Sequence, residues 1–392
     1  MDNSPILIRG ADEDRWREEL EPRLKYLLDA KLARQGKGRY TPRTSEQMSA
    51  GLAALLLAKG ETRAPRNVRR MGGGASKEQF VFELDGDATG GAEKFVLRMD
   101  PLEGIIETCR KRESQVLRAV HGVVPVPHVA FVDGDGAYMG QPAMVTRFVG
   151  GVTKPSAGGT GPSGVGIILG DRISEALAPQ YVENLAAVHR VAFSPETLPD
   201  YAAPRPGTTD AALWQINYWS RVRTDDFIDA SPLLALTETW LRARLPVCEN
   251  PVLLHGDYRL GNFMFDESTL KMTAILDWEL SHIGDVHEDL AYSLEPLFGN
   301  RDAQGRPLVA TMMTGDEFLR RYEQITGFCV NRETLHWYRV LTSYKLIVMN
   351  VTSSPRAARD GTNHQNALLG YLAACAVGMS ETLCRLLAGE EV

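Results

Sequence analysis

Three polar side chains that can do chemistry lie in the stretch LLHGDYRLGNFMFDESTLKMTAILDWE, residues 253–279. Asp257 is followed by Asn262 in the same loop, and Asp277 ends a run of apolar residues. Moving a phosphoryl group from a nucleotide to a hydroxyl needs Mg²⁺, oxygen ligands that hold it, and a carboxylate that accepts the hydroxyl proton. Asp257 fits the base, and Asn262 and Asp277 fit the ligands of Mg²⁺.

The segments around these residues predict how they meet. Two apolar runs flank the turn sequence DEST between Asn262 and Asp277, which predicts a β-hairpin that joins them. Taken singly, each polar residue is more typical of a turn or a helix cap. Taken together, with His255, Gly256 and Trp278 at matching offsets, they favour a phosphoryl-transfer site.

The sequence HGDYRLGN, followed by ILDWELSHIGDVHEDLAY, resembles the signature of the aminoglycoside phosphotransferase family, which has a protein-kinase-like fold. Within that family, the chain is most similar to phosphotransferase domains fused to certain acyl-CoA dehydrogenases and to their stand-alone bacterial relatives. The resemblance covers roughly residues 65–350. It implies that Asp257 is the catalytic aspartate, that Asn262 and Asp277 bind Mg²⁺, and that ATP or GTP is the phosphoryl donor.

A glycine run precedes the first predicted hairpin of the chain. Gly72, Gly73 and Gly74 would let the backbone approach phosphates closely, and Ser76 is a candidate donor. Such runs are often only turns, but in a kinase-like fold this position is where the phosphate loop is needed. The run is not a Walker A sequence, because no Gly-Lys-Ser/Thr follows.

Arg98, in FVLRMD, stands where kinase-like folds normally have a strand lysine. An arginine keeps the positive charge and can bind phosphate oxygens with two donors. Glu113 is the expected ion-pair partner and Glu107 the fallback, whereas the alternative is that these are solvated surface charges. By resemblance alone, Thr146 to Phe148 would form the hinge that contacts a purine.

The other polar residues near this stretch are expected to be structural. We expect His255 to pack beneath the loop, and the resemblance suggests that Asp289 braces the loop from below. Asp285 is predicted to cap the next helix, with Glu288 completing a capping box. His282 and His287 have no partner at metal-ligand spacing, so we expect both at the surface. His189 fits a helix, and we expect it to be packed there.

Hydrophobic patterning predicts an α+β, two-lobe fold. Residues 1–64 read as a helical extension in which Thr44 and Gln47 form a capping box, and 65–150 as a small lobe with an antiparallel sheet and one helix. Residues 151–392 read as a mainly helical lobe. Its first segment, 151–171, is rich in Gly, Ser, Thr and Pro, which is typical of a linker or of a mobile loop near a cleft. Helices are expected at 11–34, 45–59, 104–120, 178–192, 209–225, 231–243, 286–298, 316–326, 332–349 and 363–388.

Composition narrows the class of protein. The chain has 392 residues, 44% of them hydrophobic, a net charge of −7 and five cysteines without a CxxC pair. The negative charge argues against a nucleic-acid partner, and the cysteine pattern favours reduced thiols. Neither a signal peptide nor an apolar run long enough to span a membrane is evident, so we expect a cytoplasmic protein without a membrane partner. The oligomeric state is left open.

The sequence therefore predicts an ATP- or GTP-dependent, Mg²⁺-dependent kinase of a small-molecule hydroxyl, with a nucleotide-binding pseudokinase as the alternative. Segments 205–225 and 332–350 are candidates for the acceptor cleft. They carry more aromatic and basic side chains than acidic ones, which suits an apolar or acidic alcohol better than a polycationic aminoglycoside. These side chains are Trp214, Tyr218, Trp219, Arg221, Arg223, Trp337, Tyr338, Arg339, Tyr344 and Lys345.

Overall fold

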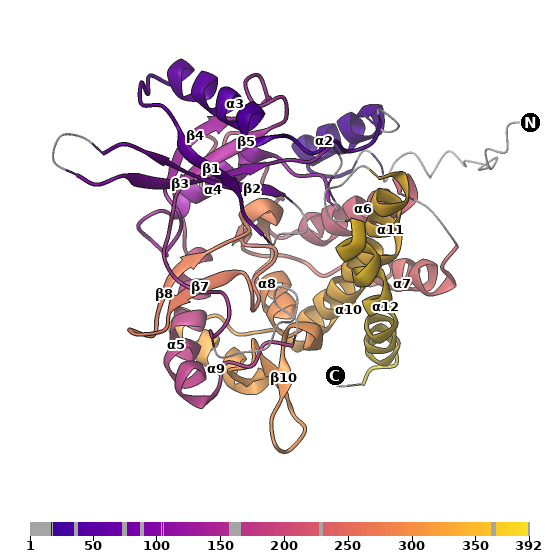
Figure 1. The fold of residues 1–392 in the computed structure, drawn as a ribbon. Helices are drawn as coiled ribbons and strands as arrows, with labels where there is room; N and C mark the ends of the chain where they lie inside the picture. Colours follow the sequence, from indigo (N-terminus) through magenta and orange to yellow (C-terminus); the bar gives the residue numbers. More distant parts are fainter. Residues whose placement is uncertain are drawn as a thin grey trace, which may run out of the picture.

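A five-stranded antiparallel sheet forms the smaller lobe of the computed structural model (Figure 1). Its spatial order is β1-β2-β3-β5-β4, and α4, Arg110–Val120, connects β3 to β4. The strands are β1 Arg66–Arg70, β2 Glu78–Leu84, β3 Glu93–Met99, β4 Val129–Asp133 and β5 Ala143–Arg147. The structure describes residues 17, 19–34, 38–72, 77–86, 90–102, 104, 106–156, 166–226, 230–361 and 366–390.

The sheet is covered by a different helix on each face. Because side chains alternate along a strand, Leu97 and Met99 face α3, Ser45–Ala58, whereas Arg98 between them faces the other way. Leu52 of α3 is fully buried in the same apolar cluster. The predicted capping box at the start of α3 is confirmed, with Gln47 N donating to Thr44 Oγ1 over 3.3 Å and Thr44 N donating to Gln47 Oε1 over 3.0 Å.

The rest of the chain is mainly helical, so the predicted α+β two-lobe architecture is confirmed. The predicted helix 286–298 ends earlier, at Ser293, because Pro296 begins a separate short 3-10 turn. A short π-helix, Met349–Ser353, continues α10. The helices are α5 Asp171–Val188, α6 Asp210–Asp225, α7 Pro232–Arg242, α8 Val286–Ser293, α9 Gly315–Thr326, α10 Arg332–Val348, α11 Ser354–Asp360 and α12 Asn366–Leu387. Among the described residues, no helix is long and apolar enough to cross a membrane.

Short strand pairs in the helical lobe carry the stretch that begins at residue 253. The strand β6, Val252–Leu254, pairs with β9, His282–Gly284, and β7, Phe263–Asp266, forms a hairpin with β8, Lys271–Ile275. The expected hairpin is thus present, and it brings Asn262, before β7, close to Asp277, after β8. A third small sheet contains β10 Asn300–Arg301, β11 Pro307–Val309 and β12 Met313–Thr314.

The N-terminal helix α2, Pro22–Arg34, joins the two lobes. Next to its first turn, Glu21 accepts a 3.0 Å hydrogen bond from Arg112 Nη2 on α4. Near its other end, Lys31 Nζ lies 2.6 Å from Asp226 Oδ2 at the end of α6. Arg356 of α11 also pairs with Asp226, over 2.8 Å. Buried ion pairs at both ends of this helix therefore attach it to both lobes.

The carboxylate of Asp226 supports a first prediction, because it is fully buried between two cations. Asp226→Ala should lower the free energy of unfolding by about 3–5 kcal/mol, since Lys31 would lose its buried carboxylate and Arg356 would keep only the more distant Asp360, 3.9 Å away, as a carboxylate partner. Urea denaturation measures this. Asp29→Ala is the control, because Asp29 is half exposed and its partner Arg221 keeps a second carboxylate, so its effect should stay below about 1 kcal/mol.

Candidate active site

The loop after β6 is held by one buried carboxylate. Asp289 of α8 accepts hydrogen bonds from the backbone N–H groups of His255 and Gly256, each over 2.8 Å, and lies 3.1 Å from His189 Nε2. Burial opposes the charge of Asp289, but the hydrogen bond with His189 and the neighbouring histidines lower its pKa to about 2. Gly256 has a φ of 82°, and a Cβ there would collide with the carbonyl oxygen of Leu280. The loop conformation therefore depends on both Asp289 and Gly256.

His255 has the structural position that we expected. Its Nε2 lies 2.9 Å from the carbonyl oxygen of Leu276, and its Nδ1 accepts from the backbone N–H of Asp257 over 3.2 Å. Burial lowers the pKa of His255, so the imidazole is neutral and donates from Nε2. The ring lies 4.5 Å from that of Trp278, which connects the loop to the residues after β8.

The side chains of Asp257 and Asn262 are hydrogen-bonded to each other. Asn262 Nδ2 donates to Asp257 Oδ2 over 2.6 Å and to the Asp257 carbonyl oxygen over 3.0 Å. This orientation directs the amide nitrogen at the carboxylate and leaves Asn262 Oδ1 for another partner. On the other carboxylate oxygen, Asp257 Oδ1 accepts from Arg259 Nε over 2.8 Å.

Asp277 lies beside this pair because the β7–β8 hairpin returns the chain to it. The backbone N–H of Leu276 donates to the carbonyl oxygen of Asn262 over 2.7 Å. Asp277 itself has φ 61° and ψ 52°, a left-handed conformation that is costly for a residue other than glycine and is often found at functional sites. Its side chain is one-third exposed and contacts Arg98.

Arg98 links the sheet to this loop and to α4. Its Nη1 lies 2.9 Å from Glu113 Oε1, and Glu113 is fully buried. Burial opposes the charge of Arg98, but the carboxylates of Glu113, Asp277 and Glu279 outweigh it and raise the pKa of the guanidinium. The expected partner of Arg98 is thus in contact, and the alternative of solvated surface charges does not describe these side chains.

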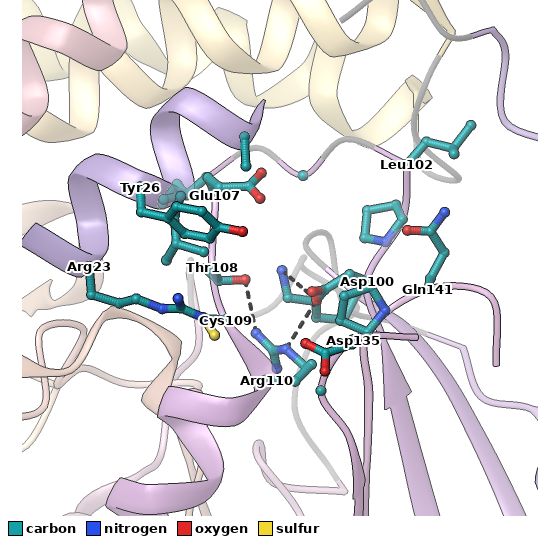
Figure 2. A pocket seen from close by; sticks show the side chains of 18 of the residues that line it. Arg23, Tyr26, Asp100, Leu102, Glu107, Thr108, Cys109, Arg110, Asp135 and Gln141 are labelled. Atoms are coloured by element: carbon teal, nitrogen blue, oxygen red, sulfur yellow. Dashed lines mark hydrogen bonds and ion pairs between the residues drawn. The ribbon is translucent and has the colours of Figure 1, made fainter. Parts of the chain in front are cut away.

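Further buried ion pairs surround Arg98. Arg110 contacts Glu113 and lies 3.0 Å from Asp100 and 3.1 Å from Glu279. Lys77 Nζ lies 3.4 Å from both Asp100 and Glu279. Figure 2 shows Arg110 between Thr108 and Asp100, where it lines a cavity of about 330 Å³ under α2. We call this set the charge network: Lys77, Arg98, Asp100, Arg110, Glu113, Asp277 and Glu279.

A larger cavity, of about 600 Å³, opens between the two lobes. Arg98, Glu113 and Asp277 lie at its wall, and Thr146 and Phe148 line it as well. A cavity with apolar walls and a few charged groups suits a small ligand with one flat and one charged part. Its apolar lining includes Val96, Leu117, Met144, Ile167, Met264 and Ile275.

The model of a family described as the phosphotransferase enzyme family matches residues 67–328. This chain belongs to the phosphotransferase enzyme family. Among curated proteins, it is 28% identical over 205 residues to acyl-CoA dehydrogenase family member 10 of Mus musculus, covering 51% of this chain and 18% of that protein. It is also 28% identical over 239 residues to acyl-CoA dehydrogenase family member 11 of Gallus gallus, covering 59% and 28%. The chain thus spans less than a third of these relatives' lengths.

Solved phosphotransferases share the fold. A presumed aminoglycoside phosphotransferase of Ralstonia eutropha JMP134 superposes with a TM-score of 0.63 at 22% identity, covering 87% of this chain and 98% of that one. A thermostable mutant of aminoglycoside phosphotransferase APH(4)-Ia, in complex with AMP-PNP and hygromycin B, gives 0.55 at 16% identity, covering 86% and 99%. These neighbours confirm the kinase-like fold expected from the resemblance.

Five of the site residues predicted from the sequence line the 600 Å³ cavity: Arg98, Glu113, Thr146, Phe148 and Asp277. Gly72 lines this cavity too, whereas three other predicted residues of the glycine run lie outside the described residues: Gly73, Gly74 and Ser76. The fallback partner, Glu107, lines the cavity under α2 instead.

Two expectations about histidines and one about a helix cap were wrong. His282 and His287 are buried, not at the surface, because His282 Nε2 lies 3.1 Å from Glu288 and His287 Nε2 accepts from the backbone of Asn331 over 3.0 Å. Asp285 does cap α8, accepting from His287 N over 3.0 Å, but Glu288 turns inward to His282 and completes no capping box. His189 is buried at the end of α5, as a packed histidine.

The aromatic and basic side chains proposed for the acceptor cleft are mostly core. Tyr218, Trp219 and Lys345 line only a cavity of about 30 Å³ behind residues 279–282, which is room for a water molecule. These side chains therefore do not support an acceptor class. Seven of the ten are buried: Tyr218, Trp219, Arg221, Trp337, Tyr338, Tyr344 and Lys345.

A group of residues on the other side of Asp257 was not expected from the sequence. The guanidinium carbon of Arg259 lies 4.6 Å from the ring centre of Phe298, and Phe298 stacks on Tyr292 at 5.4 Å. Burial and the nearby charge of Asp257 raise the pKa of Tyr292, so its phenol stays neutral. Only Arg259 carried a signal in the sequence, as a basic residue two positions after the candidate base.

Glu295 begins the turn that carries Phe298, and it supports a prediction on pH. Burial raises its pKa from 4.5 to about 7, against the opposing effects of Ser343 and Arg339. A raised carboxyl pKa stabilises the fold below about pH 4.5, and this stabilisation is lost as the pH rises through about 7. The advantage of wild type over Glu295→Gln should therefore shrink by about 2–3 kcal/mol between pH 5 and pH 8 in denaturation experiments. Glu183→Gln, on the exposed surface of α5, should leave the pH dependence unchanged.

Proposed function

We propose that this protein is an ATP- or GTP-dependent, Mg²⁺-dependent kinase that phosphorylates a hydroxyl group of a small molecule. The observation that carries the proposal is the hydrogen bond between the side chains of Asp257 and Asn262. The backbone bond of Leu276 to Asn262 holds Asp277 next to this pair, and Asp277 lines the 600 Å³ cavity. Family membership and the fold of nucleotide-bound phosphotransferases support a nucleotide as the donor. Arg98, with Glu113 behind it, is suited to hold the phosphates.

The residues present fit a nucleotide-bound Mg²⁺. Asn262 Oδ1 accepts no hydrogen bond from any described residue, and Asp277 adds a carboxylate. The described residues contain no cluster of three or more His, Cys, Asp or Glu that could hold a metal by itself. Mg²⁺ is commonly bound by one or two protein groups together with substrate phosphates, where it offsets phosphate charge. Asn262 and Asp277 would hold it here.

In the proposed reaction, Asp257 orients the acceptor hydroxyl and takes its proton. As the acceptor oxygen forms a bond to the terminal phosphorus, the bond between that phosphorus and the bridging oxygen breaks, and the nucleoside diphosphate leaves. Asn262 keeps the Asp257 carboxylate in place through its Nδ2.

The acceptor is proposed to be a small alcohol other than an aminoglycoside. Polycationic acceptors are best bound by clustered carboxylates, whereas the nearest charged neighbour of Asp257 is the cation of Arg259. The curated relatives, which are named acyl-CoA dehydrogenases, are also more similar in sequence than the APH(4)-Ia enzyme. Both observations favour a neutral or acidic hydroxyl compound, of the hydroxyacyl type or another catabolic alcohol.

A transfer assay tests this function. Purified protein, Mg²⁺ and ATP or GTP should add one phosphoryl group to an apolar or acidic alcohol in a panel of hydroxyl compounds, read by mass spectrometry. Asp257→Asn should lower turnover about 10²–10⁴-fold without loss of nucleotide affinity, because a carboxamide cannot accept the proton. Asp266→Asn, in the turn of the same hairpin, is the matched control.

Several results would contradict the proposal. Full turnover of Asp257→Asn would remove that residue as the base. Efficient phosphorylation of kanamycin-like drugs would overturn the acceptor class. Tight nucleotide binding without transfer to any compound, even water, would favour the pseudokinase.

A separate prediction concerns Asp277 and is measured by calorimetry. Asp277→Ala should weaken Mg²⁺-nucleotide binding about tenfold or more, because a metal ligand is lost. Without Mg²⁺, the same variant should bind the nucleotide as well as wild type or better, because Arg98 no longer has Asp277 as a partner. Unchanged Mg²⁺-dependent affinity would show that Asp277 is not a ligand.

A further inference from the structure

Glu21, just before α2, has a buried carboxylate with an arginine as its partner. Its two oxygens accept from the two terminal nitrogens of Arg112 on α4, with 3.0 Å between Glu21 Oε2 and Arg112 Nη2. Glu21 Oε1 also accepts from the backbone N–H of Ala202 over 3.2 Å. A two-donor contact between an arginine and a carboxylate fixes direction as well as distance. Glu21 therefore holds Arg112 in one orientation.

Arg112 in turn holds α4 against segments outside the small lobe. Its guanidinium donates to the carbonyl oxygen of Asp200 over 2.7 Å and to that of Ser281 over 3.5 Å. The guanidinium carbon also lies 3.9 Å from the ring centre of Tyr201. Asp200 and Tyr201 lie between α5 and α6, and Ser281 directly precedes β9. This one side chain therefore joins α4 to two segments of the helical lobe.

The residue after Arg112 is Glu113, the buried partner of Arg98. Glu113 Oε1 lies 2.9 Å from Arg98 Nη1, and Arg98 lines the 600 Å³ cavity. Consecutive side chains of an α-helix point about 100° apart, so Arg112 contacts the helical lobe while Glu113 contacts the sheet. A rotation or shift of α4 that moves Arg112 would therefore also move Glu113 relative to Arg98.

Glu21 supplies the countercharge of Arg112. Among the described residues, it is the only carboxylate paired with Arg112, whose side chain is 5% exposed. Without Glu21, neutral groups alone would contact this buried guanidinium, which is unfavourable for a charge. A movement of α4 that lets Arg112 reach water would relieve the charge. The Glu21 carboxylate therefore favours the position of α4 in which Glu113 meets Arg98.

We infer that Glu21 is a positioning residue for nucleotide binding. Through Arg112 it keeps α4 in place, and α4 in turn keeps Glu113 against Arg98, which contacts the phosphates in the proposed complex. The inference rests on the proposed function and adds to it a residue of the N-terminal segment. Glu21 does not line the 600 Å³ cavity, so it would act without touching the nucleotide. The other buried anchor of α2, at Asp226, joins α2 to α6 and α11 instead.

Calorimetry with Mg²⁺ and a nonhydrolysable analogue of ATP or GTP tests this inference without knowledge of the acceptor. Glu21→Gln should weaken binding of the analogue about tenfold, because Arg98 loses its fixed orientation toward the phosphates. Glu21→Asp should lose less, because it keeps the charge, and it carries the test if Glu21→Gln does not fold.

Asp226→Asn is the matched control. It breaks the other buried anchor of α2 and should lower the denaturation temperature, because Lys31 loses its countercharge. Its affinity for the analogue should stay within about twofold of wild type, because Asp226 is too far from the nucleotide site to couple with it. Thermal denaturation verifies that each variant is folded at the temperature of the titration.

A double-mutant cycle determines whether Glu21 acts through Arg98. In an Arg98→Ala background, Glu21→Gln should change the affinity less than about twofold, because the group that it positions is gone. If Arg98→Ala binds too weakly to titrate, Arg98→Lys replaces it in the cycle, since an ammonium group has no planar fork to orient.

The possible failures are distinguishable. If wild type does not bind the nucleotide analogue with Mg²⁺, the proposed function is wrong. If wild type binds it and Glu21→Gln binds it as tightly, the function stands and the role of Glu21 is wrong. An equal loss caused by Glu21→Gln in the Arg98→Ala background, or an equal loss in Asp226→Asn, would make Glu21 a purely structural residue and would also overturn the inference.

Discussion

Compensation of buried charge governs how the two lobes meet. The carboxylates of the charge network come from the residue after β3, from α4 and from residues 277–279. Its cations come from the residue before β2, from β3 and from α4. Removing one such charge from water costs several kcal/mol unless an opposite charge lies in contact with it. Each charge of the network has an opposite charge in contact only when sheet, helix and loop lie together. The hairpin of β7 and β8 brings Asp277 next to Asn262, and the ion pair with Arg98 then joins Asp277 to the sheet.

The same balance explains why a triphosphate would need a metal ion here. Three cations of the network, Lys77, Arg98 and Arg110, face four carboxylates, so the network already carries a net negative charge. In the proposed complex, a nucleotide would add several negative charges near Asp277, and like charges repel strongly in a partly buried site. In the proposed function, Asp277 and Asn262 would hold a divalent cation, whose charge would offset part of this negative charge. The charges already present in the chain therefore support the proposed Mg²⁺ dependence.

The sequence predicted those features that depend on neighbours in the chain. The hairpin between Asn262 and Asp277 and the capping box at Thr44 follow from local turn and cap chemistry. The burial of His282 and His287 was missed because their partners are chosen by tertiary packing. The strand β1 was also missed, since its sequence RNVRR is charged, as suits a sheet edge exposed to water. The role of α2 could not be predicted either, because its ion pairs join residues that are far apart in the chain, such as Lys31 and Asp226.

Two arginines of the site are paired with the two aspartates on which the proposed chemistry depends, Arg98 with Asp277 and Arg259 with Asp257. Without a nucleotide, each pair neutralises a carboxylate that would otherwise be poorly solvated. In the proposed complex with Mg²⁺, Asp277 would gain a stronger partner, and Arg98 would be able to contact the phosphates while its ion pair with Glu113 remains. Arg259 differs, because its contact is with the carboxylate of the proposed base rather than with a proposed metal ligand. In the proposed reaction, Arg98 would therefore have to exchange partners when the nucleotide binds, whereas Arg259 would keep its contact with the base.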